Sequence, residues 1–348
     1  MSLPASRLRP AAPPVSAADR YRQVRAQTLA LCAPLAVEDF IVQSMPDASP
    51  AKWHLAHSTW FFEEFVLQRS SANYRYCDER FRYLFNSYYR AVGAMHPRAE
   101  RGLLTRPLVS EVMRYRGEVD ARKEHLLAGD VAPDTAAIVI LGMHHEQQHQ
   151  ELLLTDIKHA FSRNPLRPAY TAPPPAPAPA LSAPALQFVS FAGGHADIGH
   201  AGEDFAFDNE EPRHQVLLQC YGLANRPVLN SEYRDFVRDG GYREPTLWLS
   251  DGWAQLEREG WSQPLYWNAE LDGEFTLHGE IALAATAPAC HLSYYEADAF
   301  ARWAGARLPT EFEWEHAASA HPRAGNFLES GALRPLAHSG AREPLVQL

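Results

Sequence analysis

The sequence predicts an α-helical bundle followed by an irregular α+β domain, with an extended linker between them. Residues 17–164 carry four long segments with helical patterns, as an antiparallel four-helix bundle requires. Residues 165–185 are rich in proline and alanine, a composition that is typical of an extended linker. Residues 186–348 combine short strand-like runs with few helices and with loops rich in tryptophan and glycine. A chain of 348 residues is long enough for two such domains.

The composition narrows the class of protein. A net charge of −10 argues against a nucleic-acid partner, because phosphate binding needs a basic surface. The N-terminus lacks the apolar core of a signal peptide, and no run approaches the roughly 20 apolar residues that span a bilayer. The cysteines are far apart and form no CxxC pair, so they indicate neither a zinc ribbon nor a disulfide framework. They are Cys32, Cys77, Cys220 and Cys290. We therefore expect a cytoplasmic protein with reduced thiols and no membrane partner.

The first domain is expected to begin after a disordered leader, residues 1–16, which is rich in proline and alanine. A first helix is predicted over residues 17–35. The helix over residues 50–65 has apolar side chains on most of its faces, so we expect it to be buried. A third helix is predicted over residues 110–128, and Asp134 can cap the fourth. Bundles of this kind build metal sites from side chains on facing helices.

The fourth helix carries the most informative pattern. His145 and His149 are four residues apart, so they lie on one helix face and can reach one metal ion. Glu151 lies about 240° around the helix from His145. This position suits a residue that hydrogen-bonds to a metal ligand better than it suits a ligand itself. His54 and His57, on the second helix, are both candidates for a third ligand. The alternative is that the first pair forms a solvated surface and that the second is hydrogen-bonded in the core.

Aromatic and basic side chains gather between the second and third helices. Tyr88 and Tyr89 are adjacent, and Arg98 and Arg101 follow closely. Arginines near paired tyrosines suit a small substrate with a carboxylate group. Surface ion pairs are an equally good interpretation of the arginines.

The second domain is expected to hold short strands and a few helices. The predicted elements are strands over residues 186–191 and 212–218 and helices over residues 230–239 and 293–305. Thr310 followed three residues later by Glu313 indicates a capping box at the start of another helix.

Four motifs in this order resemble the sulfoxide synthases of ergothioneine biosynthesis. They are Lys-Trp-His-Leu-Ala-His at 52–57, Asn-Ser-Tyr-Tyr at 86–89, the HxxxHxE run at 145–151, and residues 306–315 beyond the linker. The resemblance covers nearly the whole chain. It implies an N-terminal DinB-like four-helix bundle and a C-terminal domain of the formylglycine-generating-enzyme type, which has a C-type-lectin-like fold.

The resemblance also implies an activity and a cofactor. Members of the family are nonheme iron enzymes that use O₂ to join a thiol, cysteine or γ-glutamylcysteine, to the imidazole ring of hercynine, giving a sulfoxide. They bind Fe(II) through three histidines, which by motif match are His57, His145 and His149. Three imidazoles leave three open positions on an octahedral iron, enough for a thiolate and O₂.

Further site residues follow from the same resemblance. By motif match, the catalytic tyrosine is Tyr88 or Tyr89, Gln148 contacts the hercynine imidazole, and Arg98 and Arg101 hold the carboxylate of the thiol substrate. Family members continue past Glu315 through a Trp-Glu-Trp segment and a Gly-Gly-Ser-rich segment, which this sequence lacks. We therefore expect the second domain to be incomplete at its C-terminus and substrate binding to be affected.

Three other functions remain open from the sequence. A selenoneine-type synthase would use the same scaffold with a selenium donor. A metal-binding or sugar-binding module would carry out no redox chemistry. A thiol transferase of the DinB-like group would use a divalent metal only to activate a thiol, and would not need the second domain.

Overall fold

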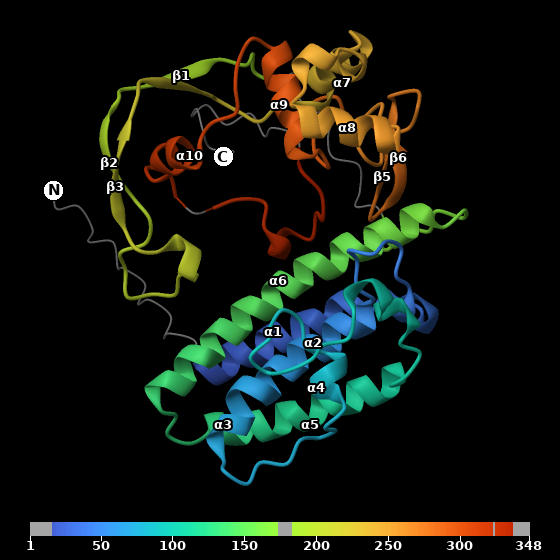
Figure 1. Ribbon diagram of the computed structural model, residues 1–348, viewed down its shortest axis with the longest axis vertical. Helices are drawn as coiled ribbons and strands as arrows, with labels where there is room; N and C mark the ends of the chain where they lie inside the picture. Colours follow the sequence, from blue (N-terminus) through green and yellow to red (C-terminus); the bar gives the residue numbers. More distant parts are fainter. Residues whose placement is uncertain (1–15, 173–182, 323, 337–348) are drawn as a thin grey trace, which may run out of the picture. The chain divides into compact units, whose positions relative to one another are not determined.

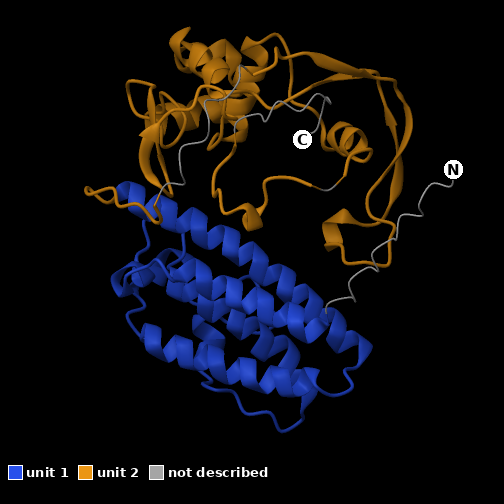
Figure 2. Cartoon of the chain, turned by 180° about the vertical axis from the view of Figure 1, so that it is seen from behind, with its two compact units in different colours: residues 1–163 blue, residues 164–348 orange. Residues whose placement is uncertain are grey.

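The computed structural model describes residues 16–172, 183–322 and 324–336, and Figure 1 labels its helices and strands. The chain divides into two compact units, residues 1–163 and 164–348, which Figure 2 shows in separate colours. The predicted leader lies outside the described residues except for Ser16. No helix in the described ranges is long and apolar enough to cross a membrane.

The first unit is built from four long helices joined by short helical turns (Figure 1). Its elements are α1 (Ala17–Cys32), η1 (Val37–Ile41), α2 (Ala51–Phe62), η2 (Glu63–Leu67), α3 (Gln68–Ser70), α4 (Phe81–Leu84), η3 (Arg98–Leu103), α5 (Val109–Leu127) and α6 (Pro133–Arg163). Helix α2 contacts both α5 and α6, and α1 also contacts α5 and α6. All four predicted long helices are therefore present, with ends shifted by a few residues.

The ends of α1 follow from local chemistry. The Ser16 hydroxyl oxygen accepts a hydrogen bond from the backbone N–H of Asp19 (3.1 Å), which satisfies one free donor of the first turn. The helix was predicted to reach residue 35 but ends at Cys32. Pro34 explains the difference, because proline lacks the N–H that would continue the helix.

Helix α2 is surrounded by the rest of the unit. All of its 12 residues are buried, as its apolar pattern predicted. It then passes into η2, a π-helical turn, a feature found frequently at functional sites. Within η2, the buried carboxylate of Glu63 accepts hydrogen bonds from the hydroxyls of Tyr74 (2.9 Å) and Tyr115 (2.6 Å), and these bonds fix the turn against its neighbours.

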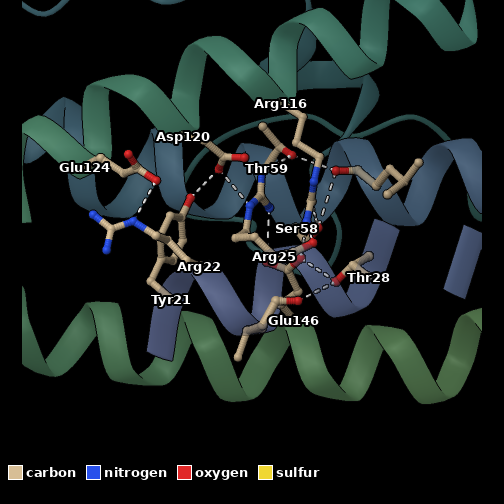
Figure 3. A network of polar contacts seen from close by, with 12 residues as sticks. Tyr21, Arg22, Arg25, Thr28, Ser58, Thr59, Arg116, Asp120, Glu124 and Glu146 are labelled. Atoms are coloured by element: carbon tan, nitrogen blue, oxygen red, sulfur yellow. Dashed lines mark hydrogen bonds and ion pairs between the residues drawn. The ribbon is translucent and has the colours of Figure 1, made fainter. Parts of the chain in front are cut away.

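A buried ion network joins α1, α5 and α6 (Figure 3). The Glu146 carboxylate, with none of its surface exposed, accepts from the Arg25 (3.0 Å) and Arg116 (2.6 Å) guanidiniums and from the Thr28 hydroxyl (2.6 Å). Arg25 also donates to Asp120 (2.7 Å). Burial alone would raise the pKa of Glu146, but Arg116 and Arg25 outweigh it and lower that pKa to about 2. The negative charges of Glu146 and Asp120 thus balance the positive charges of Arg25 and Arg116.

Lys123 is buried beside this balanced network. Its Nζ lies 3.7 Å and 3.1 Å from the ring centroids of Tyr21 and Phe62, with no hydrogen-bond partner among the described residues. Burial, and then repulsion by Arg25, lower the pKa of Lys123 well below its usual value. A cation–π contact provides about 2 kcal/mol, whereas desolvating an ammonium ion costs several. Burial therefore favours the neutral form of the amine in the folded protein.

We expect Lys123→Met to stabilise the protein at pH 7 by about 1–3 kcal/mol, since folding no longer requires an amine to be deprotonated. The unfolded state of the wild type therefore holds this proton more strongly than the folded state does. Its free energy of unfolding therefore rises with pH, by up to about 1.4 kcal/mol per unit below the unfolded pKa. Urea unfolding should show that the difference in free energy of unfolding between the two proteins is smaller at pH 9 than at pH 7. A methionine variant that is less stable than wild type at pH 7 would contradict this account.

The second unit combines short antiparallel strand pairs with helices. Its elements are β1 (Phe188–Phe191), β2 (Gly194–Ile198), η4 (Asp208–Glu210), β3 (His214–Leu218), β4 (Tyr221–Ala224), α7 (Asn230–Arg238), η5 (Gly241–Arg243), η6 (Pro245–Leu247), α8 (Ser250–Glu259), β5 (Gly273–Thr276), β6 (Gly279–Ala282), α9 (Tyr294–Trp303), α10 (Glu311–Ala318) and η7 (Leu328–Ser330). The strands pair as β1 with β4, β2 with β3 and β5 with β6. Phe188 lies opposite Ala224 in the first pair and Gly194 opposite Leu218 in the second.

Aromatic side chains from the loops and helices form the main core of this unit. Tyr233, Phe236 and Trp267 are buried together with Ala299 of α9. The predicted strands and both predicted helices are present. The sequence analysis missed β2, β4, α8 and the β5–β6 pair. The last two lie between tryptophan-rich loops.

Two local predictions in the second unit have clear outcomes. The capping box of α10 is confirmed, because the Thr310 hydroxyl accepts from the Glu313 N–H (3.2 Å) and the Glu313 carboxylate accepts from the Thr310 N–H (2.9 Å).

Part of the predicted linker, residues 165–172, packs into this unit. Tyr170 is buried there, and its N–H donates to the Leu277 carbonyl (2.9 Å). The most proline-rich part of the linker, residues 173–182, lies outside the described residues.

Candidate metal centre

The first unit brings three histidines together. His57 comes from α2, whereas His145 and His149 lie one turn apart on α6. Each offers one ring nitrogen, and these nitrogens all lie within 4.8 Å of one another. Two facing helices thus supply the cluster, as expected of a metal site in a bundle.

Hydrogen bonding fixes the orientation of the His57 ring. Its Nδ1–H donates to the backbone carbonyl of Phe85 (2.6 Å), so its Nε2 carries a lone pair. That Nε2 lies 3.2 Å from Nε2 of His145. Nδ1 of His145 is buried and has no hydrogen-bond partner among the described residues. With Nδ1 protonated, His145 would direct a second lone pair at His57, and a cation between the two nitrogens would satisfy both.

The protonation states suit a metal. Burial, followed by the neighbouring His145, lowers the pKa of His57 well below its usual value. Burial lowers the pKa of His145 to about 4. Burial and then His57 lower the pKa of His149 well below its usual value. All three imidazoles are therefore neutral at pH 7, the form that binds metal ions. Geometry, tautomer and charge all fit a single metal ion.

Aromatic rings enclose the cluster. Trp53 stacks on His57 with ring centroids 4.5 Å apart and an interplanar angle of 11°. Trp60 lies against the same imidazole at 5.5 Å, and Phe61 lies 4.6 Å from His145. These rings limit the rotation of the imidazoles and exclude water from this side of the site.

Arg101 packs against Trp53, one of these aromatic rings. Its guanidinium lies 3.4 Å from the centroid of the Trp53 ring and donates to the hydroxyls of Ser49 (2.8 Å) and Ser87 (2.9 Å). The residue is only 4% exposed. Arg101 therefore holds Trp53 in place, while its Nε has no hydrogen-bond partner among the described residues. That Arg101 also holds a substrate carboxylate stays a prediction.

His54 was the other candidate for the third ligand. Its Nδ1 lies 2.9 Å from Nδ1 of His149, and its Nε2 lies 3.0 Å from the Asp156 carboxylate. Both ring nitrogens are therefore occupied by protein groups, and His54 contacts a member of the cluster instead of joining it. Sequence reasoning missed Asp156. Its position seven residues after His149, two turns along the same helix face, is a signal that could have identified it.

Comparison with known proteins identifies the chain's relatives. The sulfatase-modifying factor enzyme 1-like domain family matches residues 173–342. Hercynine oxygenase of Mycolicibacterium thermoresistibile is 36% identical over 286 residues, covering 80% of this chain and 61% of the relative. Hercynine oxygenase of Mycolicibacterium smegmatis is 33% identical over 287 residues, covering 81% of this chain and 64% of the relative.

The chain is similar to hercynine oxygenases over four fifths of its length. It spans about three fifths of the length of these relatives. The formylglycine-generating enzyme of Mycobacterium tuberculosis is 31% identical over 135 residues, covering 32% of this chain and 45% of the relative. The predicted formylglycine-generating-enzyme-like domain is therefore confirmed for the second unit, and the first unit is the α-rich region that precedes it.

Tyr88 and Tyr89 occupy different environments. Tyr88 is 75% exposed, and its hydroxyl accepts a hydrogen bond from the Arg98 guanidinium (2.8 Å). Tyr89 is partly buried, and its ring lies 5.6 Å from that of Trp60 and 6.2 Å from that of Phe61. Because these two rings contact the cluster, one aromatic ring separates Tyr89 from the histidines. Burial raises the pKa of Tyr89, so its phenol stays protonated at neutral pH.

The remaining predicted residues lie at the surface of the first unit. Arg98 is exposed, and besides Tyr88 it donates to the Asp47 carbonyl. Gln148 is exposed on α6, directly before His149. Glu151 is also exposed on this helix, away from the cluster, as the helical geometry predicted.

Proposed function

We propose that this chain is an iron-dependent hercynine oxygenase that joins the sulfur of cysteine or γ-glutamylcysteine to the imidazole ring of hercynine. The observation that carries the proposal is the cluster of three neutral histidines, one buried and two partly buried, in a chain whose relatives are named hercynine oxygenases. We also propose that the four-helix unit is a DinB-like bundle. This assignment rests on the motifs at 52–57 and 145–151 and on the helical architecture.

The overall reaction fixes what the site must accomplish. A thiol, hercynine and O₂ become a sulfoxide and one water. One oxygen atom is retained on sulfur, and the other leaves with the thiol proton and the hydrogen of the imidazole carbon. When bound, Fe(II) would supply the redox chemistry and coordination positions for the thiolate and O₂. His57, His145 and His149 would hold it.

The other residues would bind substrates and manage protons. We propose that Arg98 pairs with the carboxylate of the thiol substrate and that Gln148 contacts the hercynine imidazole. The Tyr89 phenol is proposed as the proton donor, because it is protonated and one ring from the cluster. Tyr88 would act with Arg98 at the surface.

We expect Tyr89→Phe to lower the rate of sulfoxide formation by about 100-fold and to divert the enzyme toward simple oxidation of the thiol. Tyr88→Phe should have a smaller effect, since its hydroxyl contacts Arg98 and no aromatic layer links it to the cluster. The measurement is the ratio of sulfoxide to oxidised thiol by liquid chromatography. An unchanged ratio in both single variants and in the double variant would remove the tyrosines from the mechanism.

Oxygen uptake tests the proposed class of function. With Fe(II), hercynine and a thiol present, an oxygen electrode should record consumption that stops when any one of the three is omitted. A binding module or a thiol transferase would consume no O₂ under these conditions. Replacing the thiol with a selenosugar distinguishes a selenoneine-type enzyme, which would prefer the selenium donor.

A further inference from the structure

We propose that His54 and Asp156 are positioning residues that fix the tautomer and the orientation of His149 in the metal centre. The proposal rests on the proposed function, since it assumes that the three histidines hold a metal. It concerns two side chains that are not themselves members of the cluster.

The geometry forms a continuous chain of hydrogen bonds. A carboxylate only accepts, so Nε2–H of His54 donates to Asp156 (3.0 Å). Nδ1 of His54 is then the unprotonated nitrogen and accepts from Nδ1–H of His149 (2.9 Å). Nε2 of His149 is left with its lone pair, which is what a metal ligand needs. Asp156 thus determines, through one intervening ring, which nitrogen of His149 is free.

The same carboxylate also aligns the two helices that carry the cluster. Oδ2 of Asp156, on α6, accepts from the backbone N–H of Ser49 (2.8 Å), just before α2 begins. It therefore holds α2, which carries His57, in register with α6, which carries His145 and His149. His54 is 3% exposed and the Asp156 side chain 12% exposed, so little water competes for these bonds.

Asp156→Leu gives the sharpest test because it removes the acceptor and keeps a side chain of similar size. His54 would lose the oxygen that holds its proton on Nε2. A proton on Nδ1 of His54 would then face Nδ1–H of His149 and force the His149 proton onto its other nitrogen. Residues that hydrogen-bond to a metal ligand typically change metal affinity by about 10- to 100-fold. We expect Asp156→Leu and His54→Leu to weaken Co(II) binding by this factor.

Two further variants make the test specific. In His54→Asn the amide oxygen replaces Nδ1 as the acceptor for His149, so Co(II) affinity should stay within about threefold of wild type. His159→Asn is the matched control. This histidine lies on α6 three residues after Asp156 and bonds to the Ser44 hydroxyl (2.7 Å), outside the chain of hydrogen bonds. Its substitution should leave Co(II) affinity unchanged.

Co(II) titration of the full chain, read from the visible spectrum in competition with a chelator, is the measurement, with circular dichroism to confirm folding. It needs no hercynine or O₂, so it is independent of turnover. Weakened binding in Asp156→Leu and His54→Leu, with retention in His54→Asn, supports the proposal. Wild-type affinity in all three, or equal losses in all three, would overturn it. Failure of the wild type itself to bind Co(II) would overturn the proposed metal centre as well.

Discussion

Replacing Glu146 with glutamine should lower the free energy of unfolding of the first unit by about 3–5 kcal/mol. The substitution keeps the shape of the side chain but removes the only negative charge that contacts both Arg25 and Arg116 among the described residues. Two buried guanidiniums would then share the remaining charge of Asp120. Urea unfolding followed by far-ultraviolet circular dichroism measures the change.

Glu151→Gln is the matched control for this variant. It makes the same chemical change on the same helix at an exposed position. Its effect should stay within about 0.5 kcal/mol, as for most surface substitutions. A similar loss of unfolding free energy in the two variants would contradict this account. It would show that any loss of charge on the helix destabilises the protein, whether or not the charge belongs to the buried network.

His149→Ala should weaken metal binding by more than about 100-fold, a larger effect than that of a residue that hydrogen-bonds to a metal ligand, because a direct ligand is lost. His57→Ala and His145→Ala should behave alike, since all three nitrogens converge on one point. The readout is the increase in melting temperature on adding Co(II). A ligand that binds only the folded state stabilises it by RT ln(1 + [L]/Kd), so weaker binding gives a smaller increase.

The control for these variants is His144→Ala. His144 is adjacent to His145, but its Nε2 accepts from Arg20 (3.0 Å) instead of facing the cluster. The melting temperature of this variant should rise with Co(II) as in the wild type. A His149→Ala protein that still gains the full increase would place the metal elsewhere.

Periodic patterns accounted for most of the first unit. The four-residue spacing placed His145 and His149 on one face and Glu151 away from it, and the structure agrees. The apolar pattern of α2 predicted its burial. These features depend on the geometry of a single helix, which is why the sequence was sufficient.

Features that depend on distant partners could not be read from the sequence. Helical spacing left His54 and His57 as equal candidates. What separates them is the Phe85 carbonyl behind one ring and Asp156 behind the other. The contact of Arg101 with Trp53 likewise joins residues that are far apart in the sequence. In the second unit, α8 and the β5–β6 pair lie among long loops whose order is imposed by a shared aromatic core.

The most direct test of the account is mass spectrometry of the products formed by this chain after anaerobic reconstitution with Fe(II). Hercynine and O₂ are supplied with cysteine or γ-glutamylcysteine in parallel, and His57→Ala serves as the inactive control. The account predicts a hercynine–thiol sulfoxide with one of the two thiols, formed by the wild type and absent from the control. A wild-type protein that binds iron at the three histidines but forms no sulfoxide with either thiol would contradict it.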